Sequence, residues 1–76
     1  MRFYDYMAEH GLTDDRMAKM IGGVVSPSAV FNWRYGHRIP KPDSLRRIEK
    51  ISGGSVGISD FIAERDRVQK ARKARA

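Results

Sequence analysis

The chain has 76 residues, of which 41% are hydrophobic and 32% are charged, and its formal net charge is +6. This length allows one small domain with a modest core, and the absence of any run of about 18 apolar residues excludes a membrane-spanning helix. The chain contains no cysteine, which excludes a disulfide scaffold and a thiolate metal site.

Two short helices are predicted near the start of the chain. The first covers Phe3–His10 and is expected to act as scaffold. The second follows Thr13, whose side-chain oxygen suits an N-cap. Gly22 and Gly23 end it, because glycine accepts the left-handed conformation that a helix C-terminus often needs. The residues expected on its buried stripe are Met17, Ala18 and Ile21.

A third helix is predicted over Ser26–Tyr35. Ser26 can cap it, and Pro27 suits the first helical position, where its missing N–H costs nothing. Val30 and Trp33 lie three residues apart and share the face expected in the core. The flanks turned away from this seam carry Ser28, Phe31, Asn32 and Tyr35. A helix with one buried seam and short polar side chains near its start is shaped to enter a DNA major groove, where asparagine can pair with adenine.

The segment after Gly36 is predicted to be an extended loop. Pro40 and Pro42 prevent the third helix from continuing and favour extended backbone. This loop brings Arg38 and Lys41 close behind the third helix. We expect both side chains to reach the phosphate backbone if the helix lies in the groove.

A fourth helix is predicted from Asp43 or Ser44 to about Ser52. Its expected buried residues are Leu45, Ile48 and Ile51, and its expected outward residues are Arg46, Arg47 and Lys50. Residues 55–58 are either a strand-like segment or a loop that covers the core. Ser59 is expected to cap a fifth helix.

The fifth helix is expected to pack through Phe61 and as far as Val68. Gln69–Ala76 is helix-compatible by propensity but is expected to fray. We therefore predict a domain over residues 1–64 and a basic tail or helix extension over residues 65–76.

Positive charge is concentrated in two parts of the chain. Residues 26–50 contain six Lys or Arg and two Asp or Glu, a net charge of +4. Residues 65–76 contain six against one, a net charge of +5, whereas residues 1–25 and 51–64 have net charges of −1 and −2. The distribution favours a polyanion partner beside the third helix and the tail.

One ordered set of residues runs from the second predicted helix to the fourth: Ala18, Gly22, Ser26, Val30, Trp33, Gly36, Arg38, Ile39, Pro40, Leu45 and Ile48. This order resembles the Cro-like helix-turn-helix repressors of bacteriophages and prophages, over about residues 3–62. The resemblance implies an all-α, lambda-repressor-like bundle of four to five helices with a basic C-terminal extension. It also implies homodimers that read pseudo-palindromic operators in double-stranded DNA.

The resemblance assigns roles to individual residues. The expected base contacts are Pro27, Ser28, Phe31 and Asn32. Ser26 and nearby backbone amides are expected on a phosphate. Arg34, like Arg38 and Lys41, is expected to bind phosphate rather than bases. The dimer contacts are expected within residues 56–58 and 61–68, because apolar residues there have no evident place in a four-helix core.

One feature departs from the usual pattern. Gly22 precedes Val30 by eight positions, whereas the turn glycine usually precedes the buried aliphatic residue by six. The turn is therefore predicted to be two residues longer, within Gly23-Val24-Val25. We expect Val24 or Val25 to contact the core.

Other classes of function have little support in the sequence. His10 and His37 lack metal-ligand spacing, so we expect no catalytic residue, metal, cofactor or small-molecule substrate. No apolar segment follows Met1-Arg2, so we expect no secretory signal and a location in the bacterial cytoplasm or nucleoid. Two alternatives stay open: an antitoxin or phage adaptor that acts through protein contacts, and a non-specific architectural DNA-binding protein.

Overall fold

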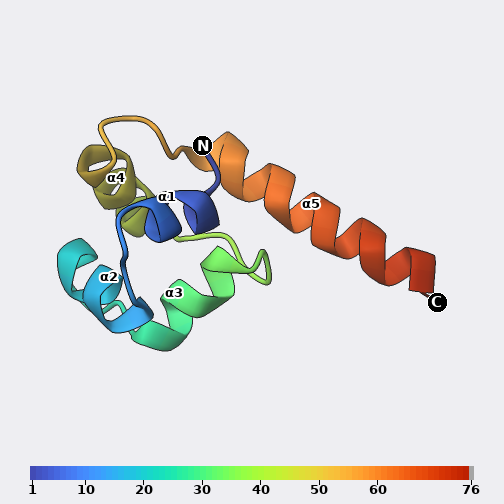
Figure 1. Cartoon of the computed structure of the whole chain (residues 1–76), viewed down its shortest axis with the longest axis horizontal. Helices are drawn as coiled ribbons and strands as arrows, with labels where there is room; N and C mark the ends of the chain where they lie inside the picture. The colour runs from blue at the N-terminus through green and yellow to red at the C-terminus, as the bar shows by residue number, and fades with distance from the viewer. Residues whose placement is uncertain (76) are drawn as a thin grey trace.

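A computed structural model describes residues 1–75 of the chain, and the side-chain surroundings of residues 1–71. It contains five helices: α1 (Phe3–Glu9), α2 (Asp14–Ile21), α3 (Pro27–Arg34), α4 (Pro42–Ile51) and α5 (Ile58–Arg75). No strand occurs within residues 1–75, which confirms the predicted all-α fold. The first four helices cluster together, and α5 runs outward from them (Figure 1). Within the same residues, no helix has an apolar stretch long enough to cross a membrane.

The start of α2 and the start of α3 follow the predicted caps. The Thr13 hydroxyl oxygen accepts from the backbone N–H of Arg16 at 3.2 Å. The Ser26 hydroxyl oxygen accepts from the N–H of Ala29, also at 3.2 Å, and Pro27 occupies the first turn. Each cap satisfies one of the backbone donors that a helix start leaves free. The sequence therefore located both members of the helix pair correctly.

The turn between α2 and α3 runs from Gly22 to Ser26, with the extra length that the sequence predicts. Gly22 and Gly23 have φ values of +77° and +69°, a region that glycine enters without steric cost. Val25 packs against the core, whereas Val24 is fully exposed. Of the two valines considered for the core, only the second enters it.

The fourth helix begins earlier than predicted, at Pro42 rather than at Asp43 or Ser44. Pro42 occupies the first turn, where proline needs no N–H partner and its fixed φ suits a helix. The sequence analysis treated this proline as part of the loop. Lys41 is the N-cap residue and offers no side-chain cap.

The segment between α4 and α5 is a turn whose side chains serve the core, so the strand-like alternative is wrong. Val56 is completely buried, and its N–H donates to the Ser52 hydroxyl at 3.2 Å. The predicted cap at Ser59 is also wrong, because α5 already begins at Ile58. Instead, the Asp60 carboxylate accepts from the N–H of Gly57 at 2.9 Å and satisfies a donor at the helix start.

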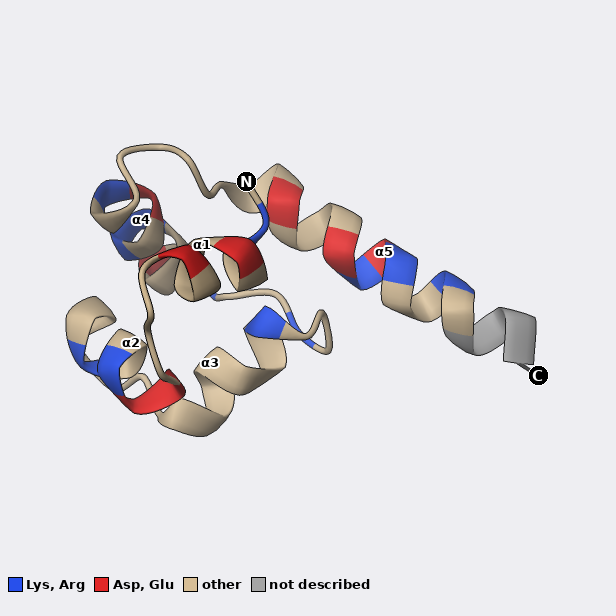
Figure 2. Cartoon of the chain, viewed as in Figure 1, with Lys and Arg blue, Asp and Glu red and all other residues tan. Residues whose placement is uncertain are grey.

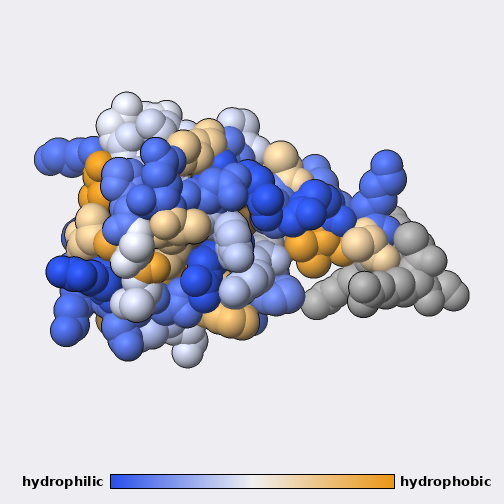
Figure 3. All heavy atoms as spheres, viewed as in Figure 1, coloured by the Kyte–Doolittle hydropathy of each residue, from blue (hydrophilic) through white to orange (hydrophobic). Residues whose placement is uncertain are grey.

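The core gathers side chains from all five helices and the turn before α5. Its members are Phe3, Tyr6, Met7, Met17, Ala18, Ile21, Val30, Trp33, Leu45, Ile48, Val56 and Phe61. The alternative that residues 55–58 form a loop covering the core is confirmed by Val56, whereas the expectation that apolar residues in 56–58 and 61–68 lack a place in the core is wrong for Val56 and Phe61. Ile58 and Ile62 are the exposed apolar residues at the start of α5. Figure 3 shows one face of the molecule, which is mainly hydrophilic with small hydrophobic patches between the hydrophilic residues.

The fifth helix rests directly on the end of the third. A Cβ atom on Gly36 would lie 2.9 Å from the backbone oxygen of Glu64 and 2.9 Å from a methyl group of Val68. Glu64 is itself buried and accepts hydrogen bonds from Arg2 at 2.9 Å and from Arg67 at 2.6 Å. These contacts fix the α3 terminus against α5.

The fifth helix continues through Arg75 without a break, as the helix propensity of the residues after Val68 predicts, and their fraying stays a prediction. Ala76 lies outside the described residues. The predicted boundary between residues 64 and 65 falls inside this continuous helix. The division into a domain and a tail stays a prediction.

Candidate nucleic-acid interface

The third helix divides cleanly into a buried seam and an outer face. Val30 is 0% exposed and Trp33 is 7% exposed, as the sequence predicts. Pro27, Ser28 and Phe31 are exposed on the other side, and Asn32 is half-buried. The four predicted base contacts therefore come together on one surface, which we call the α3 outer face (Pro27, Ser28, Phe31 and Asn32).

A shallow hollow of about 420 Å³ lies over the α3 outer face. All four residues of that face line it, together with Asp14 from the start of α2. Asp14 was not among the predicted site residues. Its nearness follows from the packing of the helix pair, which brings the first turn of α2 alongside α3.

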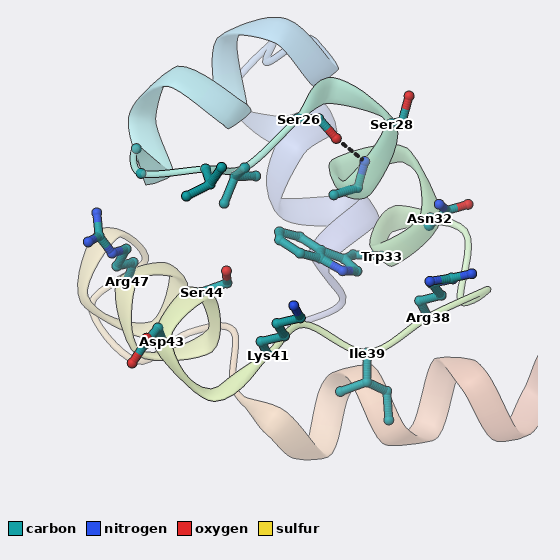
Figure 4. Close-up of a pocket in the computed structure, with 15 residues that line it drawn as sticks. Ser26, Ser28, Asn32, Trp33, Arg38, Ile39, Lys41, Asp43, Ser44 and Arg47 are labelled. Atoms are coloured by element: carbon teal, nitrogen blue, oxygen red, sulfur yellow. Dashed lines mark hydrogen bonds between the residues drawn. The ribbon is translucent and has the colours of Figure 1, made fainter.

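A larger groove of about 670 Å³ separates α3 from α4. Its walls are the long turn and α3 on one side, and the loop after α3 with the first half of α4 on the other (Figure 4). Ser28 and Asn32 line this groove as well as the hollow. They therefore form the ridge between two concave surfaces.

Three cations line the groove: Arg38, Lys41 and Arg47. All three are exposed. Because Lys41 gives no side-chain cap, the first N–H groups of α4 add a partial positive charge to the same wall. This wall is suited to an anion such as a phosphate, and it includes two of the residues predicted for that role.

The sequence analysis did not assign Arg47 to the site and expected it to point outward. Arg47 is exposed, as predicted, but its guanidinium also donates to the backbone oxygen of Ile21 at 3.1 Å. Figure 4 shows the side chain reaching from α4 toward the turn. Helical periodicity alone places it on the solvent side.

Arg34 occupies a different environment from the groove cations. It pairs with Asp14 at 3.2 Å, and its guanidinium carbon lies 4.7 Å from the centre of the Tyr35 ring. The Phe31 and Tyr35 ring centres are 4.7 Å apart. Arg34 therefore joins α2 to the end of α3, and its predicted phosphate contact stays a prediction.

Ser26, the other predicted phosphate contact, uses its hydroxyl oxygen as the α3 cap. The residue is exposed and lines the groove. The hydroxyl hydrogen is free to rotate toward an acceptor while its oxygen holds the cap. Capping and phosphate binding are therefore compatible at this residue.

Charge is distributed unequally on the two sides of α3. Figure 2 shows acidic residues on α1, an acidic start of α2 followed by basic residues, and both basic and acidic residues on α4, where the basic ones are more numerous. The acidic side includes Asp14 and Asp15 in the first turn of α2. A polyanion lying along α3 would meet its strongest attraction on the α4 side.

Comparison with protein families matches residues 3–57 to the helix-turn-helix model. No curated protein and no solved structure gives a significant match to the chain. The matched span covers most of the chain and contains α1 to α4 with the outer face and both concave surfaces. The chain therefore belongs to the helix-turn-helix family of Cro- and lambda-repressor-like DNA-binding domains.

Proposed function

We propose that this protein is a sequence-specific transcriptional regulator, a Cro-like repressor of phage or prophage type, which reads the major groove with α3. It acts without enzymatic chemistry or a cofactor. Its proposed state on DNA is a homodimer bound to a pseudo-palindromic operator, and its proposed location is the bacterial cytoplasm or nucleoid. Family membership supports the DNA-binding part of this proposal.

The observation that carries the proposal is the division of α3 into two faces. Val30 and Trp33 hold one face in the core, so the opposite face must point outward. That face presents a hydroxyl at Ser28 and an amide at Asn32 on the ridge between the hollow and the groove. An amide can donate and accept at an adenine edge, and a hydroxyl can do either.

The cationic wall supports the orientation of the complex. With α3 in the groove, Arg38 and Lys41 lie on the α4 side, where the phosphate backbone of one strand would run. Such contacts position the protein but do not read sequence. Arg34 and Ser26 are proposed to add phosphate contacts from α3 itself.

Enrichment of sites from a random duplex pool tests the proposal directly. We expect an inverted repeat to emerge, with half-sites about one helical turn apart. Binding to that site should fall by about a thousandfold between 50 and 200 mM salt if about six phosphates are engaged. A pool that yields no preferred sequence, or a flat salt response, would contradict a sequence-specific regulator.

The enriched and random duplexes also distinguish the two alternative functions. Equal affinity for the enriched and random duplexes would indicate an architectural DNA-binding protein. No binding to any duplex at low salt would favour an adaptor or antitoxin that contacts a protein partner. Analytical ultracentrifugation with and without the enriched site would establish whether two copies bind together.

A further inference from the structure

The turn between α2 and α3 has few internal restraints on its two glycines, although Val25 at its other end packs against the core. The last helical hydrogen bond of α2 runs from the N–H of Gly22 to the oxygen of Ala18 at 3.0 Å. Gly23 and Val24 form a tight turn, and within the described residues their N–H groups make no hydrogen bond in the fold. Two consecutive glycines have the greatest backbone freedom that a chain can have. Something outside the turn must hold it.

The Arg47 side chain supplies that restraint. Its Nη1 atom donates to the oxygen of Ile21, the last residue of α2, at 3.1 Å. The guanidinium also lies along the next two residues. A Cβ atom on Gly22 would be 3.3 Å from Nη1, and one on Gly23 would be 3.7 to 3.9 Å from three guanidinium atoms. The planar group therefore covers the backbone of both glycines.

The base of this contact is rigid. Arg47 lies on α4 between Leu45 and Ile48, both of which are buried in the core. The start of the turn is thus fastened to α4 by one side chain, while Val25 packs against the core at the other end. A charge-assisted hydrogen bond to a helix-terminal carbonyl also satisfies an acceptor that a helix end leaves free.

We infer that Arg47 is a positioning residue for DNA reading, because it fixes the long turn that delivers the start of α3 to the groove. The inference rests on the proposed function. Arg47 also lines the cationic groove, so a phosphate contact is the obvious alternative role. The two roles predict different measurements, because a phosphate contact changes the salt dependence and a turn restraint changes sequence discrimination.

Arg47→Met tests the inference, with Arg46→Met as the matched control. Each variant removes one positive charge from α4, but Arg46 is 79% exposed and pairs only with Asp43, at 3.8 Å. In the free protein we expect ¹⁵N order parameters of residues 22–25 to fall from about 0.85 to below about 0.6 in Arg47→Met and to stay high in Arg46→Met. This measurement does not depend on DNA.

On DNA, Arg47→Met should lower the affinity ratio between the enriched site and random duplex by about tenfold, the size of one lost charge-assisted hydrogen bond. The salt slopes of the two variants should agree. Arg47→Lys keeps the charge but not the planar group, and we expect it to recover only part of the discrimination.

Two results would overturn the inference. One is an unchanged set of order parameters in Arg47→Met. The other is a salt slope lower by about 0.9 than that of Arg46→Met with discrimination intact, which would make Arg47 a phosphate contact. A wild-type protein without sequence preference would instead reject the proposed function, so the two failures are distinguishable.

Discussion

Asn32 has the most constrained surroundings of the four residues on the α3 outer face. It is half-buried on the ridge between the hollow and the groove, while its neighbours Pro27, Ser28 and Phe31 are more exposed. Its backbone oxygen accepts from the N–H groups of His37 and Arg38, which ties the exit of α3 to the same residue. Side chains held in one orientation discriminate better than free ones.

Replacing Asn32 with alanine should therefore weaken binding to the enriched site by about 1–3 kcal/mol and relax the preference at one base pair. Replacing Arg38 with alanine is the contrasting change. It should weaken enriched and random duplexes alike and reduce the salt slope by about one. Titrations of both variants against both duplexes at several salt concentrations measure the difference. If Asn32→Ala loses the same affinity for the enriched and the random duplex, Asn32 does not read a base.

We expect Asp14 to oppose DNA binding from within the hollow, because its negative charge lies beside the proposed DNA path. Its carboxylate lies among the residues of the α3 outer face and holds Arg34 at 3.2 Å. Asp14→Asn removes a negative charge beside the proposed DNA path and frees a guanidinium. We expect tighter binding to random duplex and a salt slope steeper by about 0.9.

Asp5→Asn is the control for this change, because it removes the same charge from an exposed position on α1, away from both basic segments. It should leave the slope unchanged. Affinities are best compared well below the unfolding temperature, since Asp14 also lies in the first turn of α2 and stabilises that helix start. Equal slopes in the two variants would mean that Arg34 does not reach DNA when it is released.

Among the elements, α5 has the clearest structural role, because it is fastened to the end of α3. Gly36, with φ of +75°, leaves no room for a side chain between the two helices. Glu64 completes the junction from α5, with Arg2 and Arg67 as its partners. The contact thus depends on one missing side chain and one buried carboxylate.

Gly36→Ala should destabilise the protein more than any other glycine-to-alanine change at a helix end. Gly53 is the matched control, since its φ is +62° but nothing lies within 4 Å of the position of a Cβ atom. We expect Gly53→Ala to cost about 1–2 kcal/mol through its backbone conformation alone. Gly36→Ala should cost about 1–3 kcal/mol more through overpacking against α5. Urea unfolding measures both free energies. Equal decreases in the two variants would show that α5 can move to accommodate the added methyl group without loss of stability.

Glu64 should make stability depend on acid pH. The hydrogen bond from Arg67 lowers the pKa of Glu64 below its ordinary value, with Arg2 acting in the same direction against the opposing effect of burial. A lowered pKa means that the folded state binds the proton less tightly than the unfolded chain does. The stabilisation is therefore complete above the unfolded pKa of about 4.3 and is lost as the pH falls through the folded value.

Unfolding free energies measured from pH 7 to pH 3 check this dependence. The Glu64→Gln variant should be less stable than the wild type at pH 7. Its unfolding free energy should also decrease less than that of the wild type as the pH falls. Glu9→Gln, at an exposed position on α1, is the control and should follow the wild type. If the unfolding free energy of Glu64→Gln decreases with pH as much as that of the wild type, Glu64 is not the source of the pH dependence.

Local chemistry was sufficient to predict α2 and α3. A hydroxyl oxygen at Thr13 or Ser26 satisfies a helix donor wherever the rest of the chain goes, and the spacing of Val30 and Trp33 leaves only one face for the core. Pro42 was ambiguous, because proline suits both a loop and the first turn of a helix. The sequence offered no rule to choose between them.

Contacts between distant elements were not predictable from the sequence. Periodicity gave Arg47 an outward direction, but a long side chain can bend back to a carbonyl 26 positions away in the chain. Asp14 lines the hollow because α2 packs on α3. Val56 lies in the core because the turn that carries it folds back over the helices. The residues on the outer face of α3 could be predicted because the buried residues on the opposite face were recognisable. The residues that surround this outer face could be identified only from the structure.

At the scale of the whole molecule, the charge distribution is one-sided. The α4 side of α3 carries Arg38, Lys41 and Arg47, whereas the α2 side begins with Asp14 and Asp15. A duplex along α3 would be held mainly through the backbone of one strand. The net charge of the whole chain is +6, which favours a general attraction to DNA. The orientation on DNA would depend instead on the charged residues beside α3.

The seating of α5 on Gly36 also links two surfaces that lie far apart along the chain. Residues 65–76 have a net charge of +5, and the helix that carries residues 65–75 is the same one that presses on the exit of α3. If α3 reads an operator as proposed, a ligand that tilts α5 should disturb the end of α3, and by reciprocity operator binding should alter the affinity of the basic segment for that ligand.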